Sequence, residues 1–209
     1  MNGKNNLMGE KEIKTLFLRS IYEAAVGILG ASDSVLIFSA IIDWDGTNEI
    51  PEIENKPQFL SDLGNEFAIR FQRNTAKGLL YRVGDSSFTY LRRNSKKLLD
   101  LGSIENRLKP ISKRFDYSLG VLAGSLSELT GLKIKAIIKS KNSFCLGISR
   151  NKNDELFSSD LYLFYFSGLL RAFCEWMDSR KEYFINVNEE NGVGKDGKLV
   201  CFRYEDIDP

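Results

Sequence analysis

The chain has 209 residues, 43% hydrophobic and 27% charged, and its 29 basic and 28 acidic residues leave a net charge of +1. This length suits one folded domain with a substantial core, and the balanced charge predicts neither a nucleic-acid partner nor attraction to an anionic membrane. Histidine is absent, which excludes histidine acid–base chemistry and histidine-ligated zinc or heme.

The three cysteines, Cys145, Cys174 and Cys201, are odd in number and form no C-x-x-C motif. We therefore expect reduced, mostly buried thiols, no zinc site and a cytoplasmic protein. Residues 1–9 are polar and lack the apolar segment typical of a secretory signal. No apolar run reaches the roughly 20 residues that a membrane-spanning helix needs.

Helical spacing of apolar residues dominates the first 130 residues. The run at 34–42 could be helix or strand, and Asp33, a good helix cap, favours helix. At Gly84 we expect a bend between two helical pieces, and Pro110 suits a first helical turn. The predicted helices cover residues 10–29, 34–42, 59–71, 79–91 and 110–130, with a looser connector at 96–104.

The second half of the chain changes to strand patterns. Alternating apolar and basic residues at 132–139 predict a half-buried strand. Further strands are expected at 144–149, 183–188 and 199–204, with one apolar helix at 158–178. The order strand-strand-helix-strand-strand predicts an α+β fold, in which a four-stranded antiparallel sheet has helices packed on one face. Residues 1–58 are predicted as an N-terminal helical extension of the α+β domain at 59–209, the two forming one compact unit.

Several short motifs that superficially resemble functional sites are better explained as turns, loops or helix caps. Residues 192–198 resemble a phosphate loop, but Leu199 replaces the Ser or Thr and a strand follows, so a hairpin turn is predicted. Residues 43–49 match a calcium loop only in part, which favours a solvated loop over a weak metal site. Ser86 and Ser87 would cap a helix, since no base activates them. No catalytic residue, metal ligand or cofactor is predicted, and we expect no enzyme activity.

The aromatic segment at 161–176 carries apolar residues on almost every face, so it should be buried all round. It indicates either a core helix or dimer face, or the wall of an apolar cavity. The small residues Ser167, Gly168 and Ala172 could leave room for a ligand or admit another helix.

The apolar pair Leu79-Leu80, followed at fixed spacing by Gly84 and Phe88, resembles the helix junction of prokaryotic 4-vinyl-reductase-type (hydrocarbon-binding) domains. The element order over residues 59–206 is also similar to theirs and to that of the TRAPP vesicle-tethering subunits. The resemblance implies a dimeric α+β domain with an apolar pocket between helices and sheet, which binds hydrocarbon-like or porphyrin-like molecules. In the TRAPP branch it implies an assembly subunit.

Many members of the family carry cysteines, plausible metal ligands, after the second strand and around the final hairpin, where this chain retains only Cys201, adjacent to Phe202 rather than one residue from it. The loop after the second strand reads Arg150-Asn151-Lys152-Asn153, and Val200 holds the cysteine position if Phe202 matches the family's aromatic residue. The resemblance therefore implies that a family metal site is lost here.

Three functions remain open from the sequence. The first is a non-enzymatic sensor or carrier that binds an apolar small molecule, either hydrocarbon-like or tetrapyrrole-like. The second is a homodimeric interaction module without a ligand, and the third is an accessory factor in tetrapyrrole metabolism. The first requires unfilled apolar space beside the aromatic helix. The predicted pocket residues are Leu80, Gly84, Phe88, Leu119, Leu122, Phe164, Gly168 and Phe173.

Overall fold

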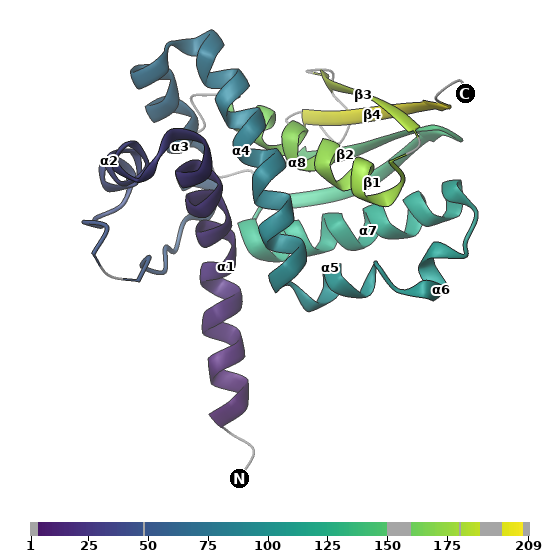
Figure 1. Ribbon diagram of the computed structural model, residues 1–209, viewed down its shortest axis with the longest axis horizontal. Helices are drawn as coiled ribbons and strands as arrows, with labels where there is room; N and C mark the ends of the chain where they lie inside the picture. The colour runs from purple at the N-terminus through teal and green to yellow at the C-terminus, as the bar shows by residue number, and fades with distance from the viewer. Residues whose placement is uncertain (1–3, 48, 150–159, 180, 189–197, 207–209) are drawn as a thin grey trace.

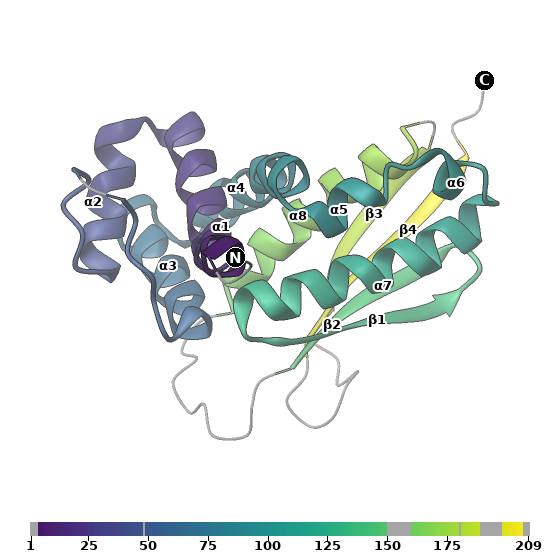
Figure 2. The same ribbon diagram turned by 90° about the horizontal axis from the view of Figure 1, so that it is seen from below.

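The computed structural model describes residues 4–47, 49–149, 160–179, 181–188 and 198–206. Helices make up the first part of the chain, and α1 to α3 form a group at one end of the molecule (Figures 1 and 2). The helices are α1 (Lys4–Leu29), α2 (Ala31–Ile41), α3 (Lys56–Phe71), α4 (Arg73–Asn94), α5 (Lys96–Asp100), α6 (Ile104–Arg107) and α7 (Ile111–Thr130).

Four antiparallel strands form one sheet in the order β1-β2-β4-β3. The strands are β1 (Lys133–Ser140), β2 (Ser143–Ser149), β3 (Lys181–Asn188) and β4 (Lys198–Asp206), and α8 (Tyr162–Met177) lies between β2 and β3 in the chain. Helices α7 and α8 pack on the sheet, and α4 packs on α8 (Figure 2). The predicted α+β fold class is therefore confirmed.

Local signals explain where several helices begin and end. The side chain of Asn55 accepts a hydrogen bond from the Gln58 amide and so caps α3, which has Pro57 in its first turn. Helix α7 ends at Gly131, whose φ of 71° is the left-handed conformation that glycine adopts without strain. We expected Pro110 in the first turn of this helix, but it is the N-cap residue, one position before α7 begins.

The predicted bend at Gly84 is wrong, because α4 continues as one helix from Arg73 to Asn94. Ser86 and Ser87 therefore lie inside α4 and cap nothing. The Ser87 hydroxyl instead donates to the carbonyl oxygen of Ser20 in α1. Gly84 instead lies where the backbones of α4 and α8 come into close contact.

The N-terminal helices pack against the rest of the chain. Phe17 and Ile21 of α1 are fully buried and belong to the same core as Leu80 of α4. The predicted boundary after residue 58 falls within the first turn of α3 and stays a prediction. In the described part of the chain, no helix has the length and apolar character needed to cross a membrane.

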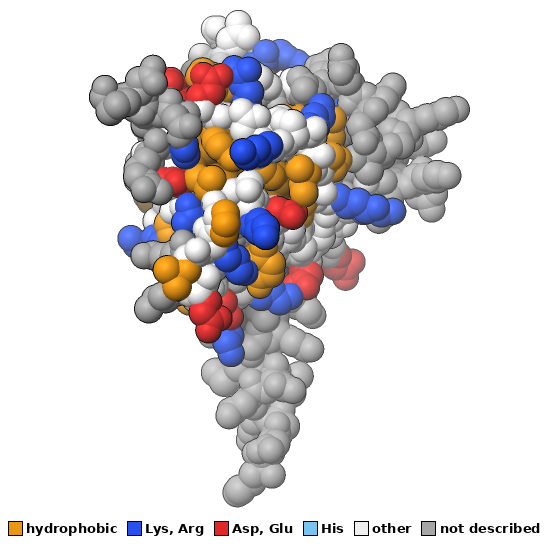
Figure 3. Space-filling view, turned by 90° about the vertical axis from the view of Figure 1, so that its right-hand side faces the viewer, with side chains coloured by type: hydrophobic (Ala, Val, Ile, Leu, Met, Phe, Trp, Pro, Cys, Tyr) orange, Lys and Arg blue, Asp and Glu red, His pale blue; other side chains and the backbone are white. Residues whose placement is uncertain are grey.

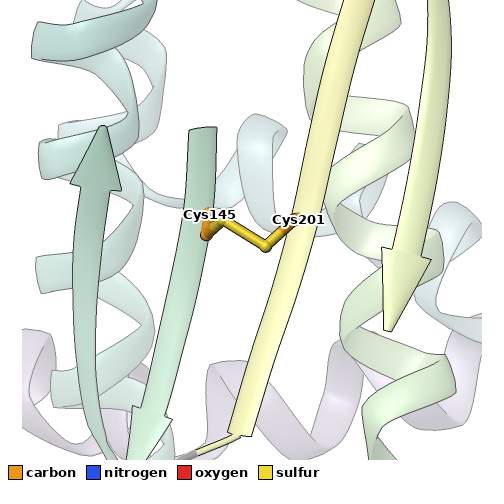
Figure 4. The surroundings of a disulfide bond; sticks show 2 residues. All are labelled: Cys145 and Cys201. Atoms are coloured by element: carbon orange, nitrogen blue, oxygen red, sulfur yellow. A yellow bond between two sulfur atoms is a disulfide. The ribbon is translucent and has the colours of Figure 1, made fainter. Parts of the chain in front are cut away.

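The expectation of three reduced thiols is wrong. Cys145 of β2 and Cys201 of β4 form a disulfide, and only Cys174 is a free cysteine among the described residues (Figure 4). The two cysteines are separated by 56 residues in the chain, but the antiparallel register makes them direct cross-strand partners. Nothing in the sequence indicated this pair, because the spacing of cysteines along the chain does not reveal which strand residues lie opposite each other.

The predicted glycine-rich turn at 192–197 and the charged loop at 150–155 lie outside the described residues.

Candidate functional site

Helices α4 and α8 touch through their backbones at two glycines. A Cβ atom added to Gly84 would overlap the carbonyl oxygen of Tyr165 and lie 3.0 Å from the amide nitrogen of Leu169. A Cβ atom added to Gly168 would overlap the carbonyl oxygen of Tyr81 and lie 2.9 Å from the amide nitrogen of Asp85. The small residues of α8 therefore admit another helix of the same chain, which is one of the two alternatives that the sequence left open.

An aromatic cluster fills the layer between the helices and the sheet. Phe115 of α7 is its centre, with five other rings whose centroids lie 5.3 to 6.3 Å from its own. All six side chains belong to the core or pack against it. Rings at such distances fill space densely. We call this group the Phe115 cluster, and its other members are Phe144, Phe173, Tyr183, Phe202 and Tyr204.

A small polar group is buried where α1, α4 and α8 meet. The Tyr165 hydroxyl has no partner at hydrogen-bonding geometry, although it lies beside the hydroxyls of Ser20 and Ser87. Those hydroxyls donate to the carbonyl oxygens of Phe17 and Ser20, respectively. Burial raises the pKa of the Tyr165 phenol, and the two serines offset this only in part. The phenol is therefore neutral in the folded protein.

The eight predicted pocket residues divide into two contacting pairs, one half-buried side chain and three buried leucines. Gly84 and Gly168 take part in the backbone contact between α4 and α8. Phe88 and Phe173 meet edge to face at 5.9 Å. Phe164 is only half-buried and lies under the ammonium group of Lys77, 5.4 Å from its ring centroid.

The other three residues, Leu80, Leu119 and Leu122, are fully covered by neighbouring atoms. The described residues thus show a densely packed region around α8, with these leucines in its core. A ligand that used this space would have to separate side chains that already touch.

A shallow pocket of about 280 Å³ lies at a different place on the described surface. It lies between the first turns of α7 and the tip of the β1–β2 hairpin, with Ser112, Lys113, Asp116 and Lys141 on its rim and Phe144 in its lining. It is open to solvent and no residue of α8 lines it, so it is not the apolar pocket that we predicted beside α8.

Local hydrogen bonds within the loop at 43–47 engage Asp45, one of its candidate calcium ligands. One carboxylate oxygen of Asp45 accepts from the amide and the hydroxyl of Thr47 at 2.9 and 2.7 Å, which lowers the pKa of Asp45. The indole of Trp44 packs edge to face against Tyr22 at 4.9 Å. Among the residues that the structure describes, no group of three or more His, Cys, Asp or Glu side chains could hold a metal ion.

Solved structures share this fold over almost the whole chain. An oxygen-binding H-NOX domain related to soluble guanylate cyclases has a TM-score of 0.59 and 12% identity, covering 94% of this chain and 96% of that one. An H-NOX protein from S. oneidensis in an Fe(II)NO ligation state has a TM-score of 0.59 and 13% identity, covering 92% and 99%. A variant of T. tengcongensis H-NOX has a TM-score of 0.60 and 11% identity, covering 94% and 98%.

At these identities the likeness establishes the fold alone. The sequence matches no protein-family profile and no curated protein. The resemblance to 4-vinyl-reductase-type and TRAPP proteins is therefore corrected: the chain has an H-NOX-like fold. The resemblance was based on the order of the elements. This chain does have the order strand-strand-helix-strand-strand, but that order does not specify how the elements pack in space.

The side chains of this protein do not fit a histidine-ligated or cysteine-ligated heme. Heme iron is held by His, thiolate Cys, Met or Tyr, and this chain contains no histidine. Burial raises the pKa of the Cys174 thiol well above its usual range, so it stays protonated, while Cys145 and Cys201 are oxidised. Tyr165 is a neutral phenol. The fold is therefore present here in a chain that has no histidine to ligate iron.

Proposed function

We propose that this protein is a non-enzymatic, sensor-type binding domain of the H-NOX fold that recognises an apolar small molecule without coordinating iron. The observation that carries the proposal is an H-NOX-like fold over 94% of a chain that lacks histidine altogether. The solved relatives bind heme or oxygen according to their descriptions. We infer that this chain keeps the binding architecture and replaces iron chemistry with apolar contact.

The binding region is proposed at α4, α7 and α8, around the eight pocket residues predicted from the sequence. Leu80, Phe88 and Phe173 are apolar and point into the shared core. Each apolar side chain that contacts a ligand contributes about 25 cal/mol per Å² of area removed from water. We expected unfilled apolar space beside α8; because these side chains instead cover one another, binding requires them to part, and we expect association to be slow.

A titration with three probes tests this function: hemin, metal-free protoporphyrin IX and a long-chain alcohol. Trp176 lies on α8 with its ring 5.9 Å from Phe88, so its fluorescence reports on the region. The chain has two tryptophans, and Trp44→Phe leaves Trp176 as the single reporter. We expect an apolar probe to quench Trp176, and metal-free protoporphyrin to bind at least as well as hemin.

Enlarging the space should strengthen binding. Phe173→Ala removes a ring from the core beside Phe88, and a void lined by apolar side chains stays dry and accepts an apolar guest. Exposed Leu108→Ala is the matched control and should leave every affinity unchanged. Stoichiometric hemin binding, with an absorbance band that shifts on adding nitric oxide, would overturn the iron-free proposal.

Failure of all three probes, in the wild type and in Phe173→Ala, would favour a homodimeric interaction module. Two apolar side chains support this second candidate: Leu36 of α2 is 51% exposed and Ile69 of α3 is 76% exposed. They lie where the helices meet, since Arg70 Nη2 donates to the Leu36 carbonyl oxygen at 3.3 Å. By contrast, the face in Figure 3 intersperses hydrophobic side chains with charges, so it lacks the continuous apolar area of an obligate interface.

Sedimentation decides whether this second candidate holds. Leu36→Glu and Ile69→Glu should convert a dimer to a monomer without unfolding it, because both side chains are exposed. Phe17 and Phe67 are unsuitable for such a test since both are fully buried. If the double variant and the wild type sediment alike, α2 and α3 are not the interface.

A further inference from the structure

The disulfide joins two strand pairs at the centre of the sheet. In the order β1-β2-β4-β3, the pairing of β2 with β4 is where the β1–β2 pair meets the β3–β4 pair. Cys145 and Cys201 stand directly opposite each other at this junction (Figure 4). The covalent bond therefore reinforces the central strand pairing, through which the β1–β2 pair is joined to the β3–β4 pair in the described sheet.

The next position in register links the disulfide to the Phe115 cluster. Phe144 precedes Cys145, Phe202 follows Cys201, and these two phenylalanines are also direct cross-strand partners. Successive side chains alternate between the faces of a strand. The two rings therefore lie on the helix-covered face, stacked at 5.3 Å with planes 15° apart, and both contact Phe115 of α7.

The cysteines lie on the opposite face, in a small apolar cluster with Leu199 and Ile137 that is separate from the main core. Cys201 retains 7% exposure, whereas Cys145 is fully buried. A thiol reductant would reach Cys201 first. The third cysteine, Cys174, is buried in α8 within the main core and is not placed to exchange with the pair.

We propose that Cys145 and Cys201 form a reversible dithiol–disulfide switch whose redox state controls how firmly β2 is held to β4. The reductant is either two molecules of a small monothiol such as glutathione or one protein dithiol. Its thiolate attacks Cys201 Sγ, the S–S bond breaks, and Cys145 leaves as a thiolate that takes up a proton. The second thiol of the reductant then releases Cys201, and the reductant becomes a disulfide.

Two electrons and two protons are thus transferred to the protein. Phe144 and Phe202 are the neighbouring cross-strand pair, so loss of the disulfide should loosen their stacking. Because both rings contact Phe115, the packing of α7 on the sheet should loosen as well. This switch does not rest on the proposed small-molecule function, because the cysteines lie on the sheet face away from the pocket residues.

The experiment equilibrates the full-length protein with glutathione buffers of graded reduced-to-oxidised ratio and then alkylates it in denaturant. Mass spectrometry should count one alkylated cysteine under oxidising conditions and three under reducing conditions, with the transition inside the glutathione range. Amide hydrogen exchange in β2 and β4 should be at least about tenfold faster in the reduced protein.

Two variants separate the pair from the remaining thiol. Cys174→Ser should keep both the transition and the change in exchange, with each thiol count lower by one. Cys145→Ser combined with Cys201→Ser should lose all redox dependence, with fast exchange at every ratio. If that double variant does not fold, the wild-type titration still decides the matter.

Three results would overturn the proposal. Three free thiols at every ratio would mean that the pair does not form. One free thiol at every ratio would mean that the bond is an inert structural link. Equal exchange rates in the oxidised and reduced protein would mean that the bond does not control the β2–β4 junction.

Discussion

Gly84 of α4 and Gly168 of α8 each lie against the backbone of the other helix, so that each glycine occupies a site where a Cβ atom would overlap a carbonyl oxygen. The two contacts are reciprocal: Gly84 faces the turn from Tyr165 to Leu169, and Gly168 faces the turn from Tyr81 to Asp85. No side chain can separate the helices at this point. The distance between α4 and α8 is therefore set by backbone atoms.

Gly84→Ala is expected to destabilise the protein severely. The added methyl group would overlap backbone atoms, which cannot move aside as a flexible side chain can. We expect a loss of about 3 kcal/mol or more in the free energy of unfolding, measured by urea denaturation. Gly168→Ala should cost a similar amount for the same reason.

Gly78→Ala is the matched control for this prediction, because Gly78 is also in α4 and a Cβ atom there would meet nothing within 4 Å. Alanine favours a helix interior over glycine by about 0.5–1 kcal/mol, so this variant should be more stable than the wild type. If Gly84→Ala and Gly78→Ala behaved alike, the close helix contact would be disproved.

Phe115→Ala tests the central position of the Phe115 cluster. Phe115 is fully buried and contacts five other rings. Its truncation should lower the free energy of unfolding by about 3–5 kcal/mol. Tyr117 lies on the same helix but is 54% exposed under Lys109, so Tyr117→Ala should cost no more than about 1 kcal/mol. Equal losses for the two variants would contradict this packing.

The ion pair between Arg114 and Asp178 is nearly buried, with 11% and 4% of the side chains exposed and 3.5 Å between Nη2 and Oδ2. Asp178→Ala removes the carboxylate beside the nearly buried guanidinium of Arg114, and we expect a loss of about 3 kcal/mol in the free energy of unfolding, measured by urea denaturation. Adding Arg114→Met should recover part of that loss, since the buried positive charge is then gone.

The exposed pair of Lys97 and Glu128 provides the comparison, because 59% of each side chain is exposed. Glu128→Ala should change the free energy of unfolding by less than about 1 kcal/mol. An Asp178→Ala variant that unfolds at the same urea concentration as Glu128→Ala would show that burial adds nothing to the first pair.

Tyr165 makes stability depend on alkaline pH. Its pKa in the folded protein is raised by burial above the ordinary value near 10, so the folded state holds this proton more tightly than the unfolded state. The resulting stability is fully present below pH 10. It is lost as the pH rises above about 10, by about 1.4 kcal/mol per pH unit for each such group.

Tyr165→Phe should therefore lose less stability than the wild type between pH 9 and pH 11.5, as measured by urea denaturation at each pH. Near pH 7 it should be close to neutral, because the Tyr165 hydroxyl has no partner at hydrogen-bonding geometry. Tyr117→Phe, at an exposed site, should follow the wild-type profile. Parallel profiles for all three proteins would refute the role of Tyr165.

Much of the architecture could be predicted from periodicity. The alternation in β1 and the apolar spacing in α7 are local signals, and both elements lie within a few residues of their predicted positions. Gly131 ended α7 as expected, because a left-handed residue is a local requirement. The helix break predicted at Gly84 was wrong, because glycine is needed there for the close contact with α8, which is distant in sequence.

Composition by itself determined one functional limit: without histidine, no fold could hold a heme through that ligand. Local patterns likewise determined the order of helices and strands, since both depend on neighbours within a few residues. Tertiary structure alone decided that Cys145 meets Cys201 and that Gly84 meets α8. It also decided that the Phe115 cluster fills the layer under α7. These are pairings across 56 residues or more, or the joint filling of one space by several elements, and both depend on register and packing between segments that no local pattern specifies.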